Sequence, residues 1–442
     1  LHSPLGIECK QEVIVMNKYI LKNGIILDGS EHMKPYKANI LVNNGIIEDI
    51  ITNGKSPSEC SEIDLDGKYI MPGLINMHVH LAGNGKPQKK QRDNEKLVKR
   101  VFATPIGRFA ATKLVENYAK IELMSGVTTI RTVGGLRDLD TKTRDKINKG
   151  LIDGPRIIAS NEAISVPGGH MAGSVAVACH NPEEALAQID KLKGEKVNLI
   201  KLMITGGVMD AKEKGVPGQM KMSPEIIKAC CDKAHEYGFI VSAHVESQEG
   251  VKIALENGVD SIEHGSVMDD ECIELFKKHN AFMICTVSPG IPYALFDQSV
   301  SHTSDVEKFN GELVLNGFIE GAKTCLKNNI PVGLGNDVGC PWIAQYDFYR
   351  ELVYFHKYVG ATNTQALHTA TLVNAKLAGI DKETGSIEKG KCADLIVCKN
   401  NPLDNLNNLR KVDMVIARGK VYDNPKVKRN AYVDSYLDEY MN

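Results

Sequence analysis

The sequence predicts an α/β protein: a (β/α)8 TIM barrel with a small β-sandwich domain built from both chain ends. Between about Ile70 and Ile380, short apolar runs alternate with amphipathic helical segments, which is typical of a parallel sheet with crossover helices. About eight such repeats favour a closed barrel. Because a barrel alone takes about 250 residues, a chain of 442 residues has room for a second unit.

The regions on either side of the barrel have β character and no helical period. Before the barrel, β-like runs at 19–21, 24–27, 39–43 and 45–51 are separated by Gly and Asn turns. After Thr384, β-like runs return at 393–398 and 412–421. We expect these segments to pair, which gives a composite β-sandwich (16–70 and 383–428), a barrel (71–382) and a C-terminal tail (429–442).

Amphipathic segments inside the barrel region predict helices over Pro182–Gly194, Ser223–Tyr237, Gly250–Gly258 and Asp269–Asn280. Active sites of such barrels lie at the carboxyl ends of the strands. The side chains that end the apolar runs are therefore the first candidates for chemistry.

His78 and His80 close the apolar run that begins at Tyr69. In a strand, side chains two residues apart project from the same face, so both histidines can bind one metal ion. An isolated His-x-His pair is more often two ordinary buried histidines. Further signals downstream reverse that preference.

These signals also lie in or at the ends of predicted strands. Lys201 sits within the apolar run 197–204, where an ammonium is costly to bury without a partner. His244 and His264 each end a short β-like run, and Asp337 ends the run 331–337. Gly333 and Gly335 lie on the same face of that last strand as Asp337 and leave space beside it.

In order and strand context, the set His78, His80, Lys201, His244, His264 and Asp337 resembles the ligand set of the amidohydrolase superfamily, from about Lys18 to about Tyr422. The resemblance implies that His78, His80 and Asp337 hold one divalent ion and that His244 and His264 hold a second. It implies two metal ions per chain, with zinc (Zn2+) expected, and a carboxylated Lys201 that bridges them. Asp337 would accept a proton from a bridging water and pass it to the leaving amine.

General chemistry supports carboxylation of Lys201 independently of the resemblance. Burial lowers the pKa of a lysine from its ordinary value of about 10.4, and a neutral amine can add carbon dioxide. The resulting carbamate is an anion with two oxygens that can ligate two cations. The alternative is a lysine that extends its ammonium to a strand end.

Loops after the strands hold candidate substrate contacts. His170 follows a Gly-Gly pair and is a candidate to polarise the scissile carbonyl or bind a carboxylate, with a solvent-facing loop histidine as the alternative. Tyr293 is a candidate donor to a substrate carboxylate, or else a packed loop aromatic. Arg131 is expected to anchor a strand end to a carboxylate. The Gly-rich segment 206–218 is a candidate lid, with Asp210 available to a basic side chain.

Composition excludes several classes of partner. The net charge is −2, from 53 Lys and Arg against 55 Asp and Glu, without a long single-sign block, so neither nucleic acid nor an acidic membrane surface is expected as a partner. No window of about 18 consecutive apolar residues occurs, so no membrane span is predicted. The eleven cysteines contain no Cys-x-x-Cys pair, which favours reduced thiols and a cytoplasmic location.

The first residues, Leu1–Gly6, contain neither an initiator methionine nor a signal-peptide pattern. Processing, an incomplete gene fragment and a natural start at Met16 all stay open as explanations.

Within the superfamily, the segments 205–207, 168–170 and 335–337 resemble peptidases that cleave the C-terminal residue from dipeptides or N-acyl amino acids. The resemblance is greatest to the zinc-dependent arginine carboxypeptidase group. It implies a metallo-carboxypeptidase or dipeptidase that favours C-terminal Arg or Lys, takes peptide or small-molecule substrates and forms a homo-oligomer. The alternatives are an Xaa-Pro dipeptidase and an imidazolonepropionase-like cyclic amidase, which uses one metal and an unmodified Lys201. A barrel that has lost its chemistry is disfavoured, because every ligand is present.

Overall fold

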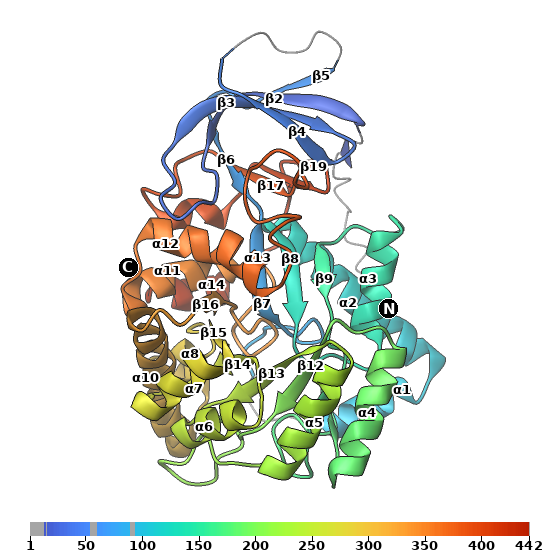
Figure 1. Ribbon diagram of the computed structural model, residues 1–442, viewed down its shortest axis with the longest axis vertical. Helices are drawn as coiled ribbons and strands as arrows, with labels where there is room; N and C mark the ends of the chain where they lie inside the picture. The colour runs from blue at the N-terminus through green and yellow to red at the C-terminus, as the bar shows by residue number, and fades with distance from the viewer. Residues whose placement is uncertain (1–12, 15, 54–59, 89–92, 442) are drawn as a thin grey trace.

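A computed structural model describes residues 13–14, 16–53, 60–88 and 93–441. Figure 1 shows a barrel surrounded by helices, with a β domain above it. The predictions for Leu1–Gly6 and Cys9 concern residues outside these ranges. The architecture confirms the predicted fold class.

Short parallel strands form the barrel. One sheet runs β11-β10-β12-β13-β14-β15-β16 and the other runs β7-β8-β9. Most of their residues are buried on both faces, as expected where helices cover a parallel sheet. The strands are β7 (Leu74–Val79), β8 (Val127–Thr132), β9 (Arg156–Ile158), β10 (Ala163–Ser165), β11 (Ala176–Ala178), β12 (Leu199–Met203), β13 (Ile240–Val245), β14 (Ser261–His264), β15 (Phe282–Cys285) and β16 (Val332–Leu334).

The two sheets join at two seams and close the ring. At the first seam, β9 pairs with β8 and β10 pairs with β12, so these two short strands together fill the third barrel position. At the second, Val79 forms a parallel bridge with Val338, and the N–H of His80 donates to the Val338 carbonyl at 2.9 Å. Closure therefore brings the histidines of the first strand beside the segment that carries Asp337.

Helices follow the strands and cover the outside of the barrel. The four predicted helices are found to within two residues of their predicted bounds, as α4 (Pro182–Gly194), α5 (Pro224–Glu236), α6 (Gln248–Glu256) and α7 (Asp270–His279). Asn181, Ser223 and Asp269 cap three of them by accepting from a first-turn N–H, which fixes where each helix begins.

The remaining helices connect the other strands or follow the barrel. They are α1 (Asn94–Phe102), α2 (Pro105–Met124), α3 (Leu139–Asn148), α8 (Gly290–Ala294), α9 (Gln298–Ser301), α10 (Asp305–Lys327), α11 (Phe348–Tyr354), α12 (Asn363–His368), α13 (Asn374–Leu377) and α14 (Ala431–Asp438), with η1 (Phe355–Val359), η2 (Thr369–Val373) and η3 (Leu406–Arg410).

Strands from both chain ends form one further sheet, in the order β1-β19-β18-β17-β6-β2-β3-β4, with β5 also on β2. The start of β2 pairs with β5 and its end pairs with β6, on either side of a bulge between Leu21 and Gly24, so the sheet divides there and surrounds a core of its own that includes Tyr19, Ile40 and Val397. Its strands are β1 (Val13–Ile14), β2 (Lys18–Ile26), β3 (Tyr36–Asn43), β4 (Ile46–Ile51), β5 (Ser61–Asp64), β6 (Tyr69–Pro72), β17 (Leu395–Cys398), β18 (Met414–Ala417) and β19 (Lys420–Asp423).

The predicted tail after residue 428 contains α14, which packs on the barrel. The fully buried Arg350 guanidinium donates to Asp434 at 2.7 Å and to Asp438. Within the described ranges, the nine cysteines from Cys179 to Cys398 form no disulfide. Across those ranges, no helix combines the length and apolar character that a membrane crossing requires.

Candidate metal centre and active site

The six predicted ligands lie at the carboxyl end of the barrel. His78, Lys201, His244 and His264 belong to β7, β12, β13 and β14, and Asp337 follows β16. All of them, with His80, line one cavity of about 560 Å³. The closed ring thus gathers residues that are up to 259 positions apart in the chain.

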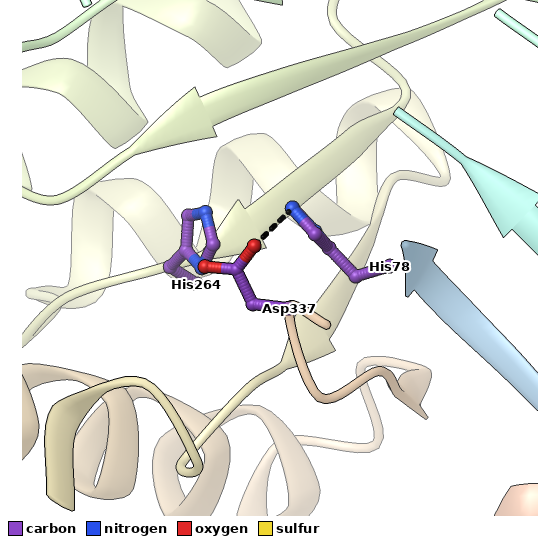
Figure 2. A group of neighbouring side chains, drawn as sticks. All are labelled: His78, His264 and Asp337. Carbon is purple, nitrogen blue, oxygen red and sulfur yellow. Dashed lines mark ion pairs between the residues drawn. The ribbon is translucent and has the colours of Figure 1, made fainter. Parts of the chain in front are cut away.

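Asp337 is the centre of the group. Figure 2 shows it between His78 and His264, and one ligand atom from each of these three residues lies within 4.8 Å of the others. Asp337 Oδ1 is 3.5 Å from His78 Nε2 and 3.3 Å from His80 Nε2. The rings of His244 and His264 are 4.7 Å apart. Residues predicted for both metal sites therefore meet around one carboxylate.

The protonation of His78 and His80 follows from their second nitrogens. His78 Nδ1 is 2.7 Å from Glu263 Oε2, and His80 Nδ1 is 2.8 Å from the Gly134 carbonyl. Both partners only accept, so in the neutral imidazole each Nδ1 carries the proton and each Nε2 presents a lone pair. Two lone pairs and an anionic oxygen repel one another unless a cation lies among them. The donor set therefore fits a divalent metal ion.

Glu263 supports this arrangement from within the barrel. Its fully buried carboxylate accepts from Arg131 Nη2 at 2.6 Å, from Ser242 Oγ at 2.7 Å and from Ser261 Oγ at 2.6 Å, in addition to His78. Although burial opposes ionisation, Arg131 and His78 hold the pKa of Glu263 well below its ordinary value. The predicted role of Arg131 as an anchor to a carboxylate is confirmed, and that carboxylate orients a metal ligand.

Burial keeps His78, His244 and His264 neutral. It lowers the pKa of His78 to about 4 and the pKa values of His244 and His264 well below the ordinary value. Neutral imidazole is the form that binds metal. Lys201 is 1% exposed, and its Nζ has no hydrogen-bond partner among the described residues. Burial lowers the pKa of Lys201 to about 8.

Backbone conformation is unusual at two of the ligands. His264 and Asp337 have φ angles of 70° and 54°, a left-handed region that costs a non-glycine residue on the order of 1–3 kcal/mol. Gly335 lies against His78, and a Cβ there would be 2.5 Å from the His78 backbone nitrogen. Glycine is therefore required for the last strand to approach the first.

His170 belongs to a second group in the same cavity. Its ring stacks on His244 with a centroid distance of 4.1 Å and an interplanar angle of 7°. Its Nδ1 is 2.5 Å from Asp210 Oδ2, which also accepts from the Gly207 N–H at 2.9 Å. Although burial opposes it, His170 holds the pKa of Asp210 below its ordinary value. His170 Nδ1 therefore donates to Asp210, which leaves Nε2 for the cavity.

Tyr293 and Glu246 also line the cavity. Tyr293 packs with Val208 and Phe318, and burial raises its pKa well above the ordinary value, so its hydroxyl stays a donor. Glu246 Oε2 is buried and accepts no hydrogen bond within the described ranges. Burial, with Asp337 and Asp210 nearby, raises the pKa of Glu246 well above its ordinary value.

Sequence reasoning missed three polar residues at this centre: Glu263, Glu246 and Cys340. The Cys340 thiol donates to Asp337 Oδ2 at 3.2 Å and so helps to direct Oδ1 toward the histidines. Glu263 carried the same signal as Lys201, an ionisable residue inside a buried strand. Cys340 carried no such signal, since it follows the last strand on a loop.

Three comparisons relate the chain to known proteins. The family model described as "Amidohydrolase family" matches residues 69–422. The ochratoxinase of Aspergillus niger is 25% identical over 419 residues, covering 83% of this chain and 81% of the relative. A solved protein from Bifidobacterium longum, described as a candidate prolidase, is 37% identical with a TM-score of 0.85 and covers 97% of this chain and 100% of its own. A solved Xaa-Pro dipeptidase with methionine in its active site is 28% identical with a TM-score of 0.80, covering 92% of this chain and 100% of its own.

Proposed function

The chain belongs to the amidohydrolase family, and we propose that it hydrolyses the amide bond to the C-terminal residue of dipeptides and N-acyl amino acids. The observation that carries the proposal is the convergence of the His78 and His80 lone pairs on Asp337 Oδ1 inside a cavity. The related Xaa-Pro dipeptidase supports the choice of a peptide bond.

Two divalent ions are proposed, with His78, His80 and Asp337 as ligands of one and His244 and His264 as ligands of the other. Zinc is the proposed metal, because imidazole and carboxylate ligands suit it. When bound, such ions lower the pKa of a water and polarise the scissile carbonyl.

Lys201 is proposed as the bridge between the two ion sites. The neutral Nζ adds to the carbon of carbon dioxide, forms an N–C bond and releases one proton, which gives a carbamate. A pKa of about 8 leaves part of the amine neutral near physiological pH. Nζ is also free of hydrogen bonds from the described residues, so carboxylation would break no such contact.

Side chains of the protein transfer protons and orient the substrate. Asp337 Oδ1 accepts no hydrogen bond among the described residues, so it is available to take the proton of the attacking water and return it to the leaving amine. Cys340 holds the other oxygen of that carboxylate. The Tyr293 hydroxyl is the proposed donor to the substrate carboxylate, and His170, whose Nδ1 donates to Asp210, would donate to it from Nε2 as an imidazolium.

Two preferences for the C-terminal residue compete. Apolar residues, including proline, fit best, because the cavity offers few acidic partners for a basic side chain. Glu246 is the sole carboxylate besides Asp337 among the described residues that line it. Arg or Lys, which the sequence resemblance implied, is the second candidate. Glu246 favours it, because Oε2 of this buried carboxyl accepts no hydrogen bond in the described ranges, so a basic substrate side chain would give it a partner.

Metal content per chain, measured by elemental analysis on the sample used for a substrate screen, tests the proposal. The screen contains dipeptides that end in Pro, Leu, Arg and Lys, their N-acetyl analogues, and imidazolonepropionate. Two metals with turnover of any C-terminal amide support it, and the best substrate decides the preference. One metal, an unmodified Lys201 by mass spectrometry and turnover of imidazolonepropionate alone would replace it with the cyclic-amidase alternative.

A further inference from the structure

The helix α2 extends past the mouth of the barrel. It has 20 residues, against 13 in α4 and in α5, a difference of about 10 Å in length. A crossover helix runs back along the barrel from the carboxyl ends of the strands, so its first turns lie on the active-site side. The buried residues of α2 begin at Ala111, which leaves the first turns beyond the packed outside of the barrel.

The N-terminal half of α2 and the helix α1 form an apolar wall, here called the annex. It consists of Leu97, Val98, Val101 and Phe102 on α1 with Ala110 and Leu114 on α2, and it lines the same cavity as the metal centre. Leu97 and Leu114 are 48% and 39% exposed, so both are accessible to a ligand. None of the side chains that α1 and α2 contribute to the lining is charged, within the part of the chain that the structure describes.

The cavity that the annex shares with the metal centre is larger than the chemistry at that centre requires. Its total volume of about 560 Å³ falls among pockets that hold drug-sized ligands, roughly 300–1,000 Å³. Single exposed apolar side chains are ordinary on a protein surface, whereas a contiguous wall that continues into a catalytic cavity marks a ligand site.

We propose that the annex binds the acyl side of the substrate, and that the preferred substrates carry an extended apolar acyl group, a long aliphatic chain or an aromatic ring system. This inference rests on the proposed function, because it assigns one end of the same amide. The C-terminal carboxylate is an anion, which is costly to place against an apolar wall without a donor. The donors His170 and Tyr293 lie on other segments that line the cavity. The acyl group is therefore the end that enters the annex.

The test measures the specificity constant kcat/KM for two series of substrates, one of L-proline and one of L-arginine. Each series contains the N-acetyl, N-butanoyl and N-octanoyl derivatives. Burial of one methylene is expected to raise kcat/KM about fourfold, so three buried methylenes give roughly 60-fold. Leu97→Gln and Leu114→Gln should each lower the ratio of octanoyl to acetyl rates several-fold. Ile106→Gln is the matched control, because Ile106 is on α2, is 82% exposed and does not line the cavity.

A binding measurement distinguishes failure of the annex proposal from failure of the proposed function. Titration calorimetry of N-acetyl- and N-octanoyl-L-proline with the metal-loaded enzyme should show tighter binding of the octanoyl derivative. Tighter binding without turnover of any amide would keep the annex and reject the proposed function. Equal affinities, or a kcat/KM that is flat with chain length and unchanged in both leucine variants, would overturn the annex.

Discussion

Replacement of Glu263 by glutamine tests whether the barrel interior holds the metal centre in place. The substitution keeps the shape of the side chain and removes its charge. Arg131 then loses its ionised partner at 2.6 Å while it stays fully buried. At the same time His78 Nδ1 faces an amide instead of a carboxylate.

The expected loss is large because both charges are inaccessible to water. Removal of one partner of a buried ion pair costs about 3–5 kcal/mol. Loss of the hydrogen-bond partner behind a metal-binding histidine typically weakens metal affinity by about 10–100-fold. In the double variant Glu263→Gln with Arg131→Met, no unpaired charge remains, so we expect it to be less destabilised than the sum of the two single variants.

Trp342, the single tryptophan of the chain, is buried near the barrel mouth, so its fluorescence during urea unfolding reports on the barrel. Measurements in a chelator remove the contribution of bound metal, and elemental analysis gives metal retention separately. Glu271→Gln is the matched control, because its pair with Lys252 is exposed and exposed pairs contribute little. A Glu263→Gln variant with the wild-type urea midpoint and full metal content would refute this reasoning.

Three further substitutions probe other parts of the protein. Lys201→Ala should lose most bound metal and activity, and added formate or acetate should restore part of both; full metal content in this variant would make Lys201 structural. Asp337→Asn should reduce kcat by at least about 100-fold with unchanged circular dichroism, and near-normal turnover would exclude it as the proton carrier. Burial raises the pKa of Glu351 from 4.5 to about 7, so the unfolded chain ionises first, and stability should fall by about 3 kcal/mol as pH rises from 4.5 through 7. Urea midpoints at several pH values should show a smaller fall in Glu351→Gln.

The positions of the metal ligands were predictable because strand geometry is simple. A period of two places His78 and His80 on one face, and a barrel collects the ends of its strands at one mouth. Lys201 was recognisable because a charge inside an apolar run needs an explanation. Each of these inferences uses only local sequence and the fold class.

The partners behind the ligands were not predictable in the same way. Pairing of Arg131 with Glu263 depends on which side chains face each other across the barrel, and the sequence does not specify that register. The positive φ angles of His264 and Asp337 are uncommon for any residue other than glycine, although His and Asp adopt them more often than most, so the sequence alone does not locate them. The annex depends on how far α2 reaches beyond the strands, which follows from helix length and barrel closure together.

The charges of the buried side chains connect the two proposals for the centre, metal binding and carboxylation of Lys201. With an unmodified, protonated lysine, the cations Arg131 and Lys201 equal the anions Glu263 and Asp337 in number. Carboxylation replaces the Lys201 cation by an anion, which leaves an excess of two negative charges on residues that are at most 7% exposed. Divalent ions are then the natural compensation, since isolated buried charge is costly. Metal binding and carboxylation of Lys201 should therefore stabilise each other, and neither should persist alone.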